Sequence, residues 1–236
     1  MSKLLSFQER RATLTPKSQK RVDEVLSTAR QVFSEFGYEK STTLEIAQRL
    51  GVSEATVFTY FGSKRELCMQ VVSDWYGEIS IELEKEVPLI PGTLARLGYI
   101  VNKHLNTLIR DGQGLCALVL SEGRSSDTGF SALLADLQRR YTAPLMEVLS
   151  AAQTAGEIRT DMPLRLMRNM MYGSMEHILW ECITNGRVPD LEATSQKVTE
   201  LLWSAFAPPD PDLNALRQLQ TDVAAALRRF EAKTNN

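Results

Sequence analysis

Residues 50–64 read LGVSEATVFTYFGSK, and this stretch decides the fold. Gly51 suits a tight turn, because glycine adopts backbone angles that other residues avoid. Ser53 fits the N-cap of a helix over 54–60, where its hydroxyl can accept from a first-turn amide. Three aromatic rings fall within residues 58–61, with Thr59 among them. Neither a core helix nor a solvent helix requires that pattern, so this helix is expected to face a binding partner.

Further helix starts lie on both sides of this stretch. Thr42 and Glu45 form a capping box, and Ser63 and Glu66 form another. Upstream, apolar residues at 22, 25, 26, 29, 32, 33 and 36 mark one face of a helix, followed by Gly37 where a C-cap belongs. The patterns predict helices over 21–36, 43–50, 54–60 and from 63 to about 85.

The helices 43–50 and 54–60 are too short to bury much surface alone, and helix 21–36 supplies the third element that they pack on. The arrangement predicts a helix-turn-helix with 54–60 as the recognition helix. Thr59 can then bond a base edge or touch a thymine methyl, and the Tyr60 hydroxyl can hold a phosphate. The outward positions are Ser53, Glu54, Ala55, Phe58, Thr59 and Tyr60.

The segment 33–67, FSEFGYEKSTTLEIAQRLGVSEATVFTYFGSKREL, resembles the TetR family of bacterial transcriptional regulators, and the similarity extends over 27–71. One departure is Phe58, which stands where family members most often carry tyrosine. On the family's pattern, the positions that map to DNA contacts are Thr42, Ser53, Ala55, Thr56, Thr59, Tyr60 and Lys64. Thr43, Glu54 and Phe58 complete the predicted interface.

The remaining sequence also predicts helices, and no β-alternation interrupts them. Their expected ranges are 92–110, 115–122, 129–155 with Pro144 inside, 163–185 and 190–206. A last amphipathic helix over 212–231 spaces Leu216, Leu219, Val223, Leu227 and Phe230 by three and four, and is too short for a stable isolated coiled coil. The fold class is therefore all-α, with an N-terminal three-helix helix-turn-helix domain and a larger helical ligand-binding and dimerisation domain.

Four regions follow from this reading. Residues 1–17 form a flexible basic arm, 18–66 the DNA-binding domain, 67–207 the effector-binding and dimerisation domain, and 208–236 a C-terminal extension. Arg10 and Arg11 of the arm are candidates for minor-groove contacts, and a solvated arm without that role is the alternative.

The family resemblance implies a homodimer through helices 163–185 and 190–206, and a small-molecule cavity between the other helices. Two heads on a two-fold axis would read a palindromic double-stranded operator. The segment 156–180 also resembles family members that sense fatty acyl compounds, which favours a hydrophobic effector. The candidate pocket residues are Leu97, Ile100, Val101, His104, Leu108, Leu118, Leu137, Tyr141, Met146, Met171 and Trp180.

Charge distribution, cysteine spacing and apolar runs limit the other functions and locations that the sequence allows. Residues 1–70 hold 11 Lys and Arg against 8 Asp and Glu, whereas 71–236 hold 16 against 21, so a basic front precedes an acidic body. The three cysteines are widely spaced, which argues against a metal site and fits the cytoplasm. No apolar run predicts a membrane span or a signal peptide.

The expected function is a ligand-responsive transcriptional repressor without a cofactor. An enzyme is a competing hypothesis, although no nucleophile–base constellation or phosphate loop supports it. An interaction module that has lost DNA binding is another. Acidic or bulky apolar replacements on the recognition face would favour that module, and Glu54 is the only acid there.

Overall fold

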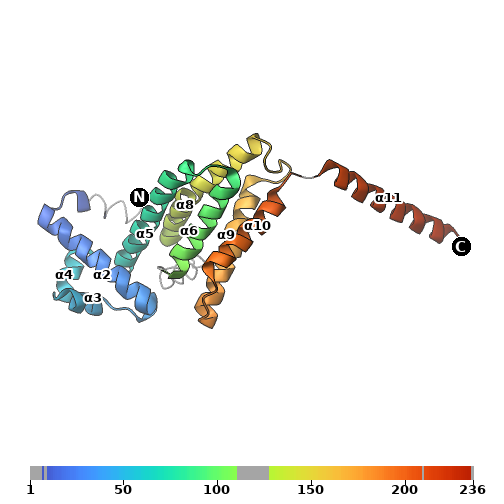
Figure 1. The fold of residues 1–236 in the computed structure, drawn as a ribbon. Coiled ribbons are helices and arrows are strands. Elements are labelled where there is room, and N and C mark those ends of the chain that lie inside the picture. Colours follow the sequence, from blue (N-terminus) through green and yellow to red (C-terminus); the bar gives the residue numbers. More distant parts are fainter. Residues whose placement is uncertain (1–6, 8–9, 111–127, 209, 235–236) are drawn as a thin grey trace.

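The computed structural model describes residues 7, 10–110, 128–208 and 210–234, and their regular elements are all helical (Figure 1). The prediction of an all-α fold with a small head and a larger helical body is confirmed. The helices are α2 (Pro16–Lys40), α3 (Thr43–Leu50), α4 (Glu54–Tyr60), α5 (Lys64–Glu86), α6 (Thr93–Arg110), α8 (Thr128–Thr154), α9 (Leu164–Asn185), α10 (Leu191–Phe206) and α11 (Pro211–Thr234), with a 3-10 turn, η1 (Val87–Leu89), after α5.

The head consists of α2, α3 and α4, which pack around one apolar core. Val25, Ala29 and Phe33 of α2 are fully buried, as are Ile46 of α3 and Val57 of α4. Because the two short helices share this core with α2, each is fixed in orientation despite its length.

The start and end of α2 differ from the predicted helix 21–36. Thr15 caps the helix with its side chain and Pro16 occupies the first turn, where a missing amide costs nothing, so α2 begins at residue 16. Gly37 has a left-handed φ of 73°, and a short helical turn follows it up to Lys40. The helix is therefore interrupted at Gly37, as predicted, but another helical turn follows before Ser41.

In the part of the N-terminal segment that the structure describes, Phe7 and residues 10–15, contacts with the head replace the unattached arm that the polar, basic sequence predicts. Phe7 is 2% exposed, and its ring stacks on that of Phe61 with 4.9 Å between centroids. Arg10 forms an ion pair with Glu66 at 2.6 Å. Both arginines proposed for the minor groove are thus held by carboxylates of this chain, because Arg11 pairs with Asp23 at 2.5 Å.

The long helix α5 joins the head to the body. It packs on α2 at its beginning and on α8 further along, and η1 leads from it to α6 (Figure 1). Trp75 and Leu83 of α5 lie in the shared core at 1% exposure each. One rigid element therefore runs from the DNA-binding domain into the body.

The body is a bundle of α6, α8, α9 and α10, in which α6 packs against each of the other three. The predicted boundaries agree with the observed ones to within one residue for α6, α8, α9 and α10, and α8 runs on through Pro144. The predicted helix 115–122, with Leu118, lies outside the described residues. None of the described helices combines the length and the apolar character needed to cross a membrane.

Candidate DNA interface and effector site

The turn between α3 and α4 sets the angle of the recognition helix. Gly51 adopts a left-handed φ of 65° and its amide bonds back to the end of α3. The amide of Val52 donates to the carbonyl of Ala47 at 3.0 Å, which closes the turn. Ser53 then caps α4 by accepting from the amide of Thr56 at 3.3 Å. Three consecutive residues therefore fix how α4 leaves α3.

The exposed face of α4 carries small, polar and aromatic side chains. Ser53, Ala55, Phe58 and Thr59 are exposed, with Phe58 at 44%, while Val57 between them is fully buried. Small residues at the start of the helix allow close approach to a groove, and large ones near its end can pack on sugars or methyl groups. The face has the size and the chemistry of a DNA-reading surface.

The Thr59 hydroxyl donates to the carbonyl of Ala55 at 2.9 Å. Its oxygen can still accept a hydrogen bond, because a hydroxyl keeps its lone pairs while it donates. In this rotamer the side chain can receive a bond from the amino group of adenine or cytosine, or can place its methyl against thymine.

Five of the predicted DNA contacts are less accessible than the sequence indicates, because Thr43 is buried and the other four are half-buried: Glu54, Thr56, Tyr60 and Lys64. Thr43 is 7% exposed, and its hydroxyl donates to a carboxylate oxygen of Glu54 at 2.6 Å. That bond joins the starts of α3 and α4, so the Thr43 hydroxyl links the two helices and is not part of the exposed face of α4. Thr56 is half-buried, and the half-buried ring of Tyr60 packs partly against the core.

Two helix N-termini flank α4. Thr42 is exposed and accepts from the amide of Glu45 at 3.1 Å at the start of α3. At the start of α5, Ser63 accepts from the amide of Glu66, whose carboxylate in turn accepts from the amide of Gly62 at 2.6 Å. Helix N-termini favour anions, so both ends are suited to phosphates.

Lys64 lies at the first position of α5 with its ammonium 4.2 Å from the ring centroid of Tyr38. This cation–π contact holds the side chain over the end of α2 and reduces the freedom it would lose on binding DNA. Arg49, by contrast, is committed within the protein, because it bonds to both Glu35 and Glu45. The hydrogen bond from the Arg49 guanidinium to Glu35 keeps the pKa of Glu35 below its usual value.

The predicted pocket residues divide into three groups in the structure. Seven are buried in the body, which are Leu97, Ile100, Val101, His104, Leu108, Tyr141 and Met171. Leu137 and Met146 are half-buried. Trp180 is 46% exposed on α9, and this exposure disagrees with its assignment to a buried pocket.

At the centre of the buried group, His104 bonds through Nδ1 to the Tyr141 hydroxyl. The ring of Tyr172 lies 5.0 Å from the His104 ring between centroids. Among the described residues, neither the histidine Nε2 nor the Tyr172 hydroxyl has a hydrogen-bond partner, although both atoms are buried. Burial lowers the pKa of His104 to about 3, so the ring is neutral at physiological pH. Such unsatisfied polar atoms are uncommon in a packed interior and can receive a ligand's polar group.

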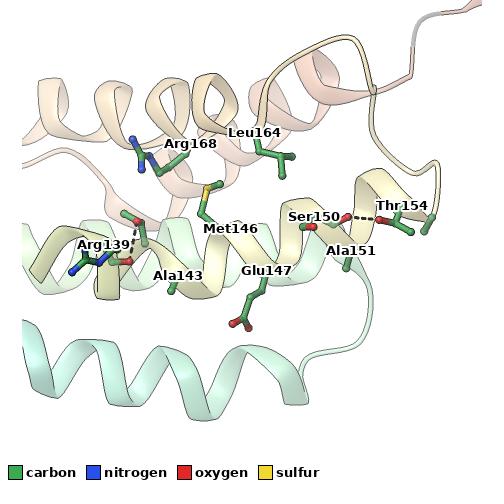
Figure 2. A pocket seen from close by; sticks show the side chains of 11 residues that line it. Arg139, Ala143, Met146, Glu147, Ser150, Ala151, Thr154, Leu164 and Arg168 are labelled. Atoms are coloured by element: carbon green, nitrogen blue, oxygen red, sulfur yellow. Dashed lines mark hydrogen bonds between the residues drawn. The ribbon is translucent and has the colours of Figure 1, made fainter. Parts of the chain in front are cut away.

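A groove of about 940 Å³ opens between α8 and α9 (Figure 2). Most of its exposed wall area is apolar, with contributions from Ala143, Met146 and Leu164, although polar side chains and Glu147 also line it. Arg139 and Arg168 lie near one end, and Thr154 lies near the other. Of the predicted pocket residues in the described part of the chain, Met146 is the one that reaches this groove. A ligand with an apolar chain and an anionic group would fit the arrangement.

Comparison with known proteins agrees with this geometry. Residues 25–71 match the family model described as "Bacterial regulatory proteins, tetR family". Residues 76–205 match the family model described as "YsiA-like protein, C-terminal region". The chain belongs to the TetR family. It is therefore a helix-turn-helix transcriptional regulator, and its matched region covers the head and the body up to the end of α10.

Two curated relatives within the TetR family are similar over most of their length. The fatty acid metabolism regulator protein of Bacillus subtilis is 25% identical over 183 residues, covering 78% of this chain and 94% of that protein. The transcriptional repressor AcnR of Corynebacterium glutamicum is 23% identical over 192 residues, covering 76% and 87%. A solved structure of FadR from Bacillus subtilis in complex with stearoyl-CoA superimposes with a TM-score of 0.69 at 25% identity, covering 77% of this chain and 97% of that one.

Proposed function

We propose that this TetR-family protein is a dimeric repressor that reads its operator with the exposed face of α4. The observation that carries the proposal is the position of that face: Phe58 and Thr59 are exposed while Val57, between them and the turn, anchors the helix in the core. Ser53 and Ala55 allow α4 to enter the groove, and Thr42 and Lys64 are placed to hold phosphates on either side.

A homodimer through α9 and α10 is supported by apolar side chains that these helices leave exposed. Leu166, Met170 and Trp180 of α9 are 47%, 38% and 46% exposed, and Leu201 of α10 is 71% exposed. Exposed apolar residues that gather on neighbouring helices are typical of a protein interface. Two copies of α9 and α10 would form a four-helix bundle, and the dimer would present two copies of α4 to a palindromic operator.

We propose a fatty acyl thioester as the effector. The groove between α8 and α9 is largely apolar, and Arg139 and Arg168 offer charges for phosphates at one end (Figure 2). The similar FadR structure contains stearoyl-CoA. The buried residues around His104 and Tyr172 would receive the part of the ligand that enters the body. Binding there would favour a body conformation in which the two α4 helices no longer fit the operator together.

A gel-shift titration on the DNA upstream of the protein's own gene tests this function. Wild-type protein should bind that fragment, and stearoyl-CoA should release it while stearate and free coenzyme A at the same concentration should not. The variant carrying Arg139→Gln and Arg168→Gln should keep operator binding and need more thioester for release. Release of the variant at the wild-type thioester concentration would remove the groove from the proposal.

The protein is further proposed to act by binding alone and to work in the cytoplasm, where its operator lies. Its relatives in the comparisons are transcriptional regulators. Chromatography of stearoyl-CoA after incubation with the protein should return the thioester intact, and accumulation of free coenzyme A would establish a turnover activity. Failure to bind any fragment of the surrounding genome would favour an interaction module instead of a repressor.

A further inference from the structure

Helix α11 projects from the body on the side away from the head (Figure 1). The four residues 207–210 separate it from the end of α10. Five large apolar side chains of α11 are exposed: Leu216 at 64%, Leu219 at 60%, Val223 at 49%, Leu227 at 57% and Phe230 at 67%. The helix therefore presents an apolar stripe to solvent along most of its length.

The spacing of this stripe is that of a coiled-coil seam. Leu216, Val223 and Phe230 are seven residues apart, and Leu219 and Ala226 repeat the same interval three residues further on. These are the a and d positions of a heptad, and Leu227 widens the seam at one edge. A heptad seam is narrow and recurs every 3.5 residues on average, which fits another helix better than a broad surface.

We propose that α11 pairs in parallel with the α11 of a second copy of this chain, forming a two-stranded coiled coil at the far end of the dimer. The pairing rests on the homodimer proposed above. Because α11 follows α10 after only four residues, a dimer through α10 holds the two stripes near each other at high effective concentration. A seam too short for an isolated coiled coil can form under that constraint.

The direction of the pairing follows from the shape of the molecule. A two-fold axis must bring both α4 helices to the same side of the dimer, where the DNA lies. Helix α11 leaves the body on the side away from the head (Figure 1). The proposed dimer would therefore place both copies of α11 at the end opposite the DNA, running in the same direction. Each a and d residue would then face its own copy across the axis, so Leu219 would lie against Leu219 of the second copy.

The charges of α11 favour this occupant over a lipid surface. Residues 211–234 contain four basic and three acidic residues, so the helix is nearly neutral. An amphipathic helix that lies on a membrane usually carries a strongly basic polar face. In a parallel pair, Asp222 at a g position would face Leu227 at the following e position of the second copy. This pair therefore places no like charges opposite each other.

The family match ends at residue 205, before α10 ends. Helix α11 is an addition to the matched region, so its stripe is not accounted for by the operator-reading head or the effector-binding body. A second contact between the two copies would strengthen the dimer without altering either site.

Disulfide trapping on the full-length protein tests the pairing. Leu219→Cys places a thiol at a d position, and Thr221→Cys places one on the opposite face of the same helix. Cys68 and Cys182 are buried, and the unmodified protein serves as the reference for all native thiols. After mild oxidation, Leu219→Cys should yield a covalent dimer on a non-reducing gel, whereas Thr221→Cys and the unmodified protein should not. Equal trapping at both positions, or none at position 219, would overturn the proposal.

Sedimentation equilibrium supplies the second measurement. Leu219→Glu should raise the dimer dissociation constant by roughly tenfold or more, because a charge replaces an apolar contact at the centre of the seam. Thr221→Glu should leave the constant unchanged, and an equal change in both variants would contradict the seam. The same preparations are then assayed for operator binding. If the protein is a dimer that binds the operator but Leu219→Cys forms no disulfide, only the α11 pairing is refuted. If the protein is a monomer that binds no operator, the proposed function is refuted as well.

Discussion

Replacing Phe7 with alanine tests whether the N-terminal segment stabilises the DNA-binding domain. Burying a phenylalanine ring is worth about 1.5–3 kcal/mol, and an aromatic pair such as Phe7 with Phe61 adds about 0.5–1.5 kcal/mol. The ring is almost fully buried, so both contributions apply. Against them, the release of Phe7 itself returns about 1–2 kcal/mol of conformational freedom to the chain. Phe7→Ala should therefore lower the free energy of unfolding by about 1–3 kcal/mol.

Urea denaturation followed by tryptophan fluorescence measures this loss, because Trp75 lies buried in α5, the helix that packs on α2 of the head. Phe58→Ala is the matched control: it removes the same side chain from an exposed site, so it should change stability by less than about 0.5 kcal/mol and weaken operator binding instead. A loss below about 0.5 kcal/mol for Phe7→Ala, or an equal loss for Phe58→Ala, would show that the segment does not dock on Phe61 in solution.

Three further predictions concern the interface, the turn and the body. In fluorescence anisotropy with operator DNA, Lys64→Ala should weaken binding about equally for all sequences and flatten the salt dependence. Thr59→Ala should mainly reduce the preference for operator over scrambled DNA. The same sequence preference and salt dependence in both variants would reject these roles. Gly51→Ala should destabilise the protein by about 1–2 kcal/mol because its φ is left-handed, while Gly77→Ala, inside α5 with open space around it, should stabilise it by about 0.5–1 kcal/mol; calorimetry would detect a reversed order. The unfolded chain protonates its histidines near pH 6.5, whereas His104 stays neutral in the folded protein down to about pH 3. The contribution of neutral His104 to the free energy of unfolding is therefore fully present above pH 6.5 and is lost by about 1 kcal/mol per pH unit below it. His104→Phe should flatten that slope in urea titrations.

The local features of the fold are predictable from the sequence because short-range chemistry determines them. Thr42, Ser53 and Ser63 each cap the helix that the sequence assigns to them, and Gly51 adopts the left-handed turn. The boundaries of α3 and α4 are correct to the residue, because a cap and a turn fix both ends within a few residues.

The features that depend on distant contacts were not predictable in the same way. Phe7 meets Phe61 across 54 residues, and nothing in a polar, basic leader indicates that its single ring is buried. Thr43 shares a capping-box sequence with Thr42, and only the packing of α3 on α4 shows which hydroxyl turns inward to Glu54. The exposure of Trp180 likewise reflects the face that α9 turns to the body, which apolar periodicity alone does not distinguish from an interface.

The junction between α4 and α5 has a mechanical consequence. Only Phe61, Gly62 and Ser63 separate the two helices, and the Glu66 carboxylate ties Gly62 to the first turn of α5. A helix of the length of α5 spans about 35 Å at 1.5 Å per residue. If the body acts as its fulcrum, a tilt of about 5° displaces the far end by about 3 Å, which is the full reach of a hydrogen bond. In the proposed mechanism, so short and tightly bonded a joint would transmit a movement of α5 directly to α4, and a modest rearrangement where α5 packs on α8 would take Thr59 out of register with a base.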